Sequence, residues 1–160
     1  MPTTVPCLWF DHGVAEQAAA FYVSVFPDSA VGTVTRYGPD TPGPEGGVMT
    51  VEFTLDGRPY TGLNGGDQFR FSEAVSFQIR CSGQEEVDHY WNSLSDGGQE
   101  GPCGWVTDRF GVSWQVDPVE LHELIEDPDR ERAERAVQAM LRMGRIDIAE
   151  LRRAADAVPA

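Results

Sequence analysis

The order of strand-like and helix-like segments repeats once along the 160-residue chain, and this repeat limits the folds that it can adopt. An apolar strand-like stretch at 5–10 precedes a stretch at 14–26 whose apolar residues recur on one helical face. We take Asp11 as the cap of this helix. Three strand-like segments follow at 30–37, 48–55 and 58–64. The last two flank Asp56-Gly57, a strong hairpin signal. The first half therefore predicts a βαβββ unit.

The second half restarts the pattern with a strand at 74–81 and a helix at 84–94. Its last strands flank the turn at Phe110-Gly111. In "VSWQVD" the alternation places Trp114 against a helix and leaves the uncharged amide of Gln115 on the opposite face. The two halves thus predict a pair of related units, with a chance similarity of strand–helix segments as the alternative.

Spacing relates individual positions of the two halves. When the two predicted helices are aligned, Ser76 occupies the position equivalent to Cys7. When the two predicted turns are aligned, Gln115 occupies the position equivalent to Thr61. A shift of two residues in the second unit would replace Ser76 by Gln78 on the same face of the strand.

Helical patterns follow the second unit. Asp117-Pro118 and Asp127-Pro128 each predict a helix start with proline at the first helical position. Asp147 and Glu150 form a cap-like pair for a further helix. The apolar stripes of these helices require a surface to pack on, either the sheet or a second subunit. We expect two units and a helical extension, at about 1–70, 71–117 and 118–160.

Composition excludes several classes of function. The net charge is −14, and all 12 basic residues are arginine. Such an acidic chain is repelled by nucleic-acid phosphates and by anionic lipids, so we expect no nucleic-acid or membrane partner. The absence of lysine excludes Schiff-base catalysis by that residue. No long apolar segment or signal-peptide pattern is present, and we expect a cytoplasmic protein.

A family resemblance rests on a long, ordered set of segments between about residues 5 and 118. They are "PCLWFD", "AEQAAAFYVSVFP", "VTRYG", "VMTVEF", "LNGG", "AVSFQI", "DHYWNSLSDGG" and "CGWVTDRFGVSWQV". This set resembles the vicinal oxygen chelate superfamily, which includes the glyoxalase and bleomycin-resistance proteins. Within it the chain is most similar to the PhnB-like branch labelled 3-demethylubiquinone-9 3-methyltransferase. The resemblance implies an α+β fold of paired βαβββ units forming half-open cups, followed by C-terminal helices.

In the superfamily, metal ligands come from the first and last strands of each unit and are typically His and Glu, sometimes Gln. Carried over by position, they correspond here to Cys7, Thr61, Ser76 or Gln78, and Gln115. These residues supply no carboxylate and no imidazole, so we expect no metal and no other cofactor. Adding nearby polar and aromatic positions, we predict a ligand-binding set of Cys7, Trp9, Thr61, Asn64, Ser76, Gln78, Trp105 and Gln115.

The predicted function is the binding of a small molecule in a cup by a homodimer, with tryptophans as walls. Whether the chain also catalyses a metal-independent reaction is left open. One alternative is a sequestration dimer like the bleomycin-resistance proteins, and another is a metal-dependent glyoxalase or dioxygenase, which the missing ligands disfavour. Gly65-Gly66 follows an antiparallel hairpin strand, so it predicts a strand-exit turn rather than a cradle for S-adenosylmethionine.

Overall fold

The computed structural model describes residues 2–157 and shows an α+β fold built from two units, Met1–Phe71 and Ser72–Ala160. Each unit contains one four-stranded sheet covered by one helix in the order β-α-β-β-β, and the second unit continues into three further helices. This confirms the fold class expected from the repeat. No helix within residues 2–157 is long and apolar enough to cross a membrane.

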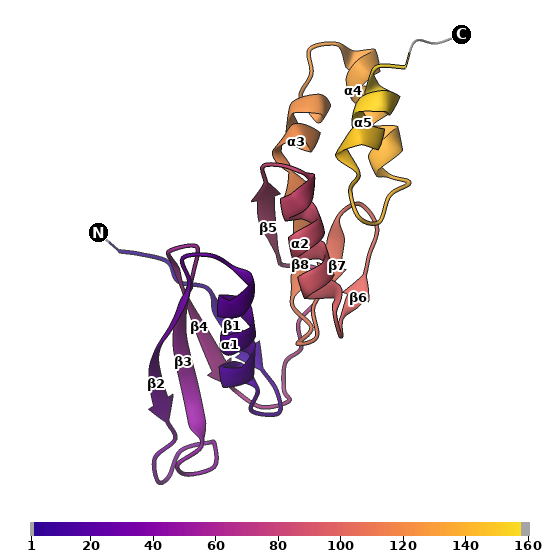
Figure 1. The fold of residues 1–160 in the computed structure, drawn as a ribbon. Helices are drawn as coiled ribbons and strands as arrows, with labels where there is room; N and C mark the ends of the chain where they lie inside the picture. Colours follow the sequence, from indigo (N-terminus) through magenta and orange to yellow (C-terminus); the bar gives the residue numbers. More distant parts are fainter. Residues whose placement is uncertain (1, 158–160) are drawn as a thin grey trace. The chain divides into compact units, whose positions relative to one another are not determined.

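The first unit has the strand order β1-β4-β3-β2, with α1 packed on one face of the sheet (Figure 1). Its elements are β1 (Cys7–Phe10), α1 (Ala15–Val25), β2 (Ala30–Arg36), β3 (Val48–Leu55) and β4 (Arg58–Asn64). The first and last strands pair in parallel, whereas β3 pairs antiparallel with both β2 and β4. Asp56 and Gly57 both have positive φ, at 49° and 70°, and form the two-residue turn that the sequence predicts.

The second unit repeats this arrangement with the strand order β5-β8-β7-β6. Its elements are β5 (Ser76–Cys81), α2 (Gln84–Ser95), β6 (Gln99–Glu100), β7 (Trp105–Thr107) and β8 (Ser113–Pro118). Again the first and last strands pair in parallel and the remaining pairs are antiparallel. The parallel pairing of first and last strands is therefore the shared rule of both sheets.

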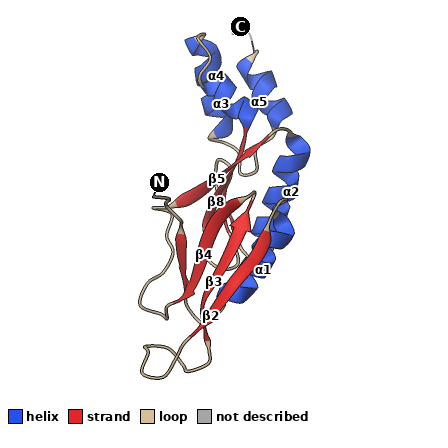
Figure 2. Ribbon diagram, turned by 90° about the vertical axis from the view of Figure 1, so that its left-hand side faces the viewer, coloured by secondary structure: helices blue, strands red, loops and turns tan. Residues whose placement is uncertain are grey.

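The first sheet buries mainly the face that carries its helix. In the first unit Leu8, Phe10, Val51 and Phe53 are at most 6% exposed, and Ala15 of α1 packs over Gly62. Figure 2 shows β2, β3 and β4 with α1 on one side of them. Because side chains alternate along a strand, the intervening residues occupy the opposite face, which carries no helix of the same unit.

The start of α1 differs from the sequence prediction. Asp11 does not cap this helix; instead the N–H of Ala15 donates to Oδ1 of Asn64 at 2.9 Å. Nδ2 of Asn64 donates to the Val48 carbonyl, and the Tyr37 hydroxyl donates to the Asn64 carbonyl. Asn64, at the end of β4, thus accepts a hydrogen bond from a backbone N–H at the start of α1 that no neighbouring side chain accepts.

The C-terminal helices are α3 (Val119–Ile125), α4 (Arg130–Met140) and α5 (Ile148–Ala155), and they pack on the second unit. Gln84 of α2 makes the connection: Nε2 donates to the Ile146 carbonyl at 3.1 Å, and Oε1 accepts from the Ile148 N–H at 2.9 Å. The helices share a core of buried side chains from Leu121, Leu124, Ala136, Ala139, Ile146, Leu151 and Ala155. The C-terminal helices therefore pack on the second unit of their own chain.

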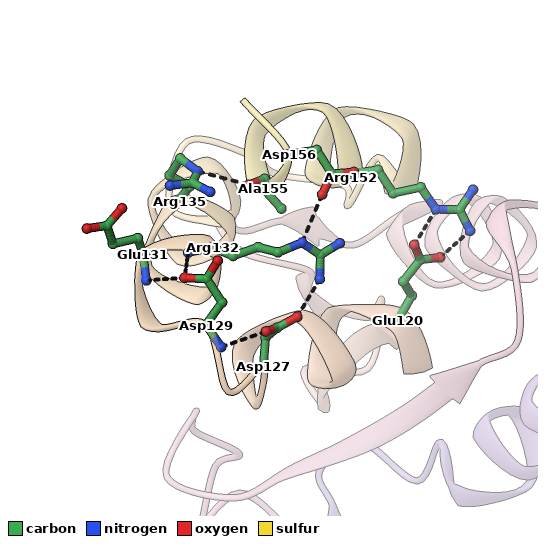
Figure 3. Close-up of polar contacts among 9 residues, drawn as sticks. All are labelled: Glu120, Asp127, Asp129, Glu131, Arg132, Arg135, Arg152, Ala155 and Asp156. Carbon is green, nitrogen blue, oxygen red and sulfur yellow. Dashed lines mark hydrogen bonds and ion pairs between the residues drawn. The ribbon is translucent and has the colours of Figure 1, made fainter. Parts of the chain in front are cut away.

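Ion pairs join these helices on the outside (Figure 3). Arg132 of α4 contacts Asp127 and donates from Nε to Asp156 at 2.8 Å, and Arg152 of α5 pairs with Glu120 of α3. Asp129 and Asp147 are the N-caps of α4 and α5. The cap at Asp147 confirms the predicted pair.

The two predicted proline starts are shifted. Pro118 is the N-cap of α3 rather than its first residue, and α4 begins two residues after Pro128. In α4 the side chain of Asp129 accepts from two backbone N–H groups and sets the start of the helix.

The turn between β7 and β8 is organised by a buried carboxylate, Asp108, which is 3% exposed. Oδ1 accepts from the N–H groups of Phe110 and Val112 at 2.8 and 3.1 Å, and Oδ2 accepts from Nε1 of Trp114 at 2.8 Å. Three donors compensate the carboxylate for its loss of water. The same contacts fix the indole on the helix side of β8.

We expect Asp108→Asn to lower the free energy of unfolding by about 1–3 kcal/mol, because the amide nitrogen cannot accept the hydrogen bond that one carboxylate oxygen now accepts. Urea unfolding of the two proteins measures the difference. Asp96→Asn is the matched control, since Asp96 pairs with Arg109 at a side-chain exposure of 78%. It should lose about 0.5 kcal/mol or less. Equal losses in both variants would contradict the role given to Asp108.

Candidate functional site

The open face of the first sheet carries a row of three side chains on adjacent strands. Cys7 of β1 lies opposite Thr61 of β4, and Thr61 lies opposite Glu52 of β3. Their neighbours Leu8, Val51 and Gly62 face the helix side. Cys7 and Glu52 are exposed and Thr61 is half-buried, so the row is accessible from the side that α1 does not cover.

The open face of the second sheet carries the corresponding row. Gln78 of β5 lies opposite Gln115 of β8, and Gln115 lies opposite Trp105 of β7. Ser76 lies opposite Ser113 on the same face. With Thr61 equivalent to Gln115, the partner equivalent to Cys7 is Gln78. The register of the sheet therefore selects the shifted alternative for the second unit.

The amide of Gln115 has few partners within the chain. Nε2 donates to Oγ of Ser76 at 2.8 Å, and Oε1 accepts from Nε2 of Gln78 at a long 3.4 Å. The residue is half-buried, and Trp114 beside it is 2% exposed on the other face. Since a side-chain amide has two donor hydrogens and two acceptor lone pairs, Gln115 retains capacity for further hydrogen bonds.

A cavity of about 330 Å³ adjoins this row at the edge of the second sheet. It is lined by Trp105, Val106 and Thr107 of β7, Gln99 and Glu100 of β6, Glu73, and Gly101 and Pro102 of the connection between β6 and β7. Trp105 links the cavity to the row because it lines one and lies opposite Gln115 in the other. The volume is within the lower range of small-molecule pockets.

Trp9 lies on the open face of the first sheet, two residues beyond Cys7. Its Nε1 donates to the carbonyl of Gly66 at 2.8 Å, and its ring lies against Gly65, where a Cβ would be 2.2 Å from the indole. The ring of Phe69 meets it edge-on at 4.9 Å between centroids. The pair Gly65-Gly66 thus accommodates an indole, as expected for a strand-exit turn.

Asn64 does not share the open face with the other predicted residues of the first unit. It faces the helix side of β4, opposite Phe10, and its amide is engaged by Ala15 and Val48. These bonds give Asn64 a structural role at the start of α1 and leave it off the open face. The remaining predicted residues divide into Cys7, Trp9 and Thr61 in the first unit and Ser76, Gln78, Trp105 and Gln115 in the second.

Glu52 is a row member that the sequence analysis missed. The signal was present, because the two-residue turn at Asp56-Gly57 places Leu55 opposite Arg58 and hence Glu52 opposite Thr61. Alternation with Val51 and Phe53 also assigns Glu52 to the open face.

The three cysteines are free thiols. Partial desolvation raises the pKa of Cys7 although its side chain is exposed, and burial next to Glu86 and Asp117 raises the pKa of Cys81 to about 12. Both shifts favour the neutral thiol, which is neither a strong nucleophile nor a metal ligand at neutral pH. Neither thiol therefore has the depressed pKa of an activated nucleophile.

The fold family implies a divalent metal ion, and the two rows do not fit one. Their donors are a thiol, a hydroxyl, two amides and the single carboxylate of Glu52. The histidines lie elsewhere: His12 is 3.3 Å from Asp11, His122 is 3.7 Å from Asp117, and His89 contacts Tyr90. Within residues 2–157, no group of three or more His, Cys, Asp or Glu side chains could hold a metal ion. We therefore derive no chemistry through a metal.

Asp117 ends the alternating series of β8 and is nearly buried, at 4% exposure. Desolvation raises the pKa of this carboxyl, and the nearby His122 and Arg80 oppose the shift. The Nε2 atom of His122 is buried and has no hydrogen-bond partner among residues 2–157. This pair lies where β8 continues into α3, and its burial leaves it inaccessible to a ligand on the open face.

Residues 2–117 match the sequence model of the family described as 3-demethylubiquinone-9 3-methyltransferase. The chain belongs to this family. A solved structure of the putative 3-demethylubiquinone-9 3-methyltransferase, PhnB protein, from Bacillus cereus is 31% identical, with a TM-score of 0.65 over 74% of this chain and 100% of that chain. The PhnB-like branch of the vicinal oxygen chelate superfamily is thereby confirmed.

Two further structures share the fold. A protein from Pseudomonas aeruginosa is 20% identical, with a TM-score of 0.61 over 74% of this chain and 98% of that chain. The fosfomycin resistance protein FosX from Listeria monocytogenes is 16% identical, with a TM-score of 0.51 over 79% and 98%. A comparison with curated proteins gives no match. The family match ends at residue 117, so α3, α4 and α5 lie beyond it.

Proposed function

We propose that this PhnB-like chain binds a small organic molecule on the open faces of its sheets through amide, hydroxyl and aromatic groups, without a metal ion. The observation that carries the proposal is the position of Gln115. Its half-buried amide lies opposite Trp105, which lines the cavity of about 330 Å³, and its hydrogen-bonding capacity is only partly used within the chain. A few oriented polar groups beside an aromatic wall are typical of small-molecule sites.

The side chains of the rows suit recognition better than a reaction. Glutamine and threonine both donate and accept hydrogen bonds at neutral charge, so they orient a ligand without a proton transfer. The rows carry no histidine, and the pKa of the Cys7 thiol is raised. Glu52 is the one group of the rows that could act as a base, and neither a histidine nor an activated nucleophile accompanies it. Binding or sequestration is therefore the function that these residues support best.

The substitution Gln115→Leu tests whether the amide of Gln115 faces a ligand or belongs to the core. We expect its free energy of unfolding to change by less than about 1 kcal/mol, because Ser76 and Gln78 can bind water instead. A compound that raises the melting temperature of the wild type should bind this variant about 1–3 kcal/mol more weakly. Melting curves with and without that compound give both quantities.

Trp114→Ala is the control on the opposite face of the same strand. It removes a buried indole and its bond to Asp108, and should lower stability by about 3–5 kcal/mol whatever ligand is present. If Gln115→Leu were strongly destabilising and left ligand binding unchanged, Gln115 would be a core residue and the proposal would fail.

We further propose that the chain forms a homodimer. Each sheet ends in strands that are unpaired on one side within the chain: β1 and β2 in the first unit, β5 and β6 in the second. In β2, six of seven residues are exposed. Open edges and an open sheet face are commonly covered by association.

Light scattering on the purified chain at micromolar concentration should therefore give about twice the monomer mass of 17.6 kDa. A single species of monomer mass, unchanged on raising the protein concentration, would refute the dimer. This outcome would leave the ligand-binding proposal intact, because each row lies within one unit of one chain.

A further inference from the structure

We propose that Glu52 is a specificity-determining residue of the first sheet and that it selects small molecules carrying a positively charged group, such as an ammonium. This inference rests on the proposed function and adds the charge of the ligand. Glu52 lies on the open face opposite Thr61, and Thr61 lies opposite Cys7. Because adjacent strands are about 4.8 Å apart, the row spans roughly 10 Å, which is the length of a small organic molecule.

The internal repeat gives an independent reason to place Glu52 at a ligand. In the second unit, the residue opposite Gln115 on the antiparallel neighbour strand is Trp105, which lines the cavity. In the first unit, the residue opposite Thr61 on the antiparallel neighbour strand is Glu52. The two rows are thus built alike, and Glu52 occupies the position of the cavity-lining tryptophan with a carboxylate.

The carboxylate of Glu52 has no ion-pair partner among residues 2–157. Arg36 belongs to the same face, but it pairs with Val48, four residues along β3 and therefore about 13 Å from Glu52. Its guanidinium donates to the Gly46 carbonyl at 3.0 Å. The exposed charge of Glu52 is thus available to a ligand.

The surroundings of Glu52 do not neutralise its charge. Its row neighbours are a hydroxyl and a thiol, and Thr50 further along β3 bonds Thr35 through their hydroxyls at 2.5 Å. The chain as a whole carries a net charge of −14. A chain with this net charge attracts cations and repels carboxylates and phosphates. Trp9 lies on the same face, where its half-buried indole packs against Gly65 and Phe69.

The test compares three probes that share a phenyl ring and differ in charge: 2-phenylethylammonium, 2-phenylethanol and phenylacetate. Their binding to the full chain is followed by the backbone-amide and indole NMR shifts. We expect the ammonium to bind most tightly and phenylacetate most weakly, with shifts at Thr61, Glu52 and Trp9. Glu52→Gln should weaken ammonium binding about fivefold and bring it to the level of the alcohol. Alcohol binding should stay unchanged.

Glu16→Gln is the matched control. Glu16 is exposed on α1, on the helix side of the same sheet, and its substitution changes the net charge by the same amount. The ammonium preference should persist in this variant. If it fell equally in both variants, the preference would come from net charge and the role of Glu52 would be refuted.

Two further outcomes separate this inference from the proposed function. Probe binding on the open faces with no charge preference, or with a preference that survives Glu52→Gln, would refute the role of Glu52 and leave small-molecule binding intact. Absence of binding by all three probes would count against both. Melting curves establish that Glu52→Gln is folded, as expected for an exposed, nearly isosteric change.

Discussion

The parallel pairing of the first and last strands of each unit brings the candidate side chains of those two strands together. It fixes Cys7 opposite Thr61 and Gln78 opposite Gln115. Because the helix covers one face of each sheet, alternation assigns these residues together to the uncovered face. A shift of one residue in either pairing would exchange the buried and open sets, which the apolar helix side strongly disfavours.

Two units built on the same rule present different chemistry. The first offers a thiol, a hydroxyl and a carboxylate, whereas the second offers two amides and an indole next to a cavity. Neither set provides an imidazole, and together they hold a single carboxylate, which is fewer ligands than a catalytic divalent ion requires. The family label names a methyl transfer, yet Gly65-Gly66 accommodates the indole of Trp9. Fold membership and the chemistry of the open faces are therefore separate conclusions.

Local signals in the sequence predicted much of the fold. The Asp56-Gly57 hairpin and the opposite orientations of Trp114 and Gln115 depend on near neighbours, and the structure confirms them. The start of α4 was misplaced because the carboxylate of Asp129, one residue beyond Pro128, accepts from the N–H groups of Glu131 and Arg132. Asn64 was interpreted as a ligand residue because its bond to Ala15 joins segments 49 residues apart. Glu52 was missed because the pairing across the Asp56-Gly57 hairpin was not used to find the residue opposite Thr61.

The central claim is that the open faces recognise an organic molecule with the side chains that replace metal ligands. The most direct measurement is the metal content of the chain, purified without chelators or an affinity metal and analysed by elemental mass spectrometry. The account predicts zinc, nickel, manganese and iron each far below one ion per chain, because the rows supply no imidazole and only one carboxylate. The account would be contradicted by about one metal ion per chain, if substitution of Gln115 or Thr61 removed that ion and lowered activity or stability.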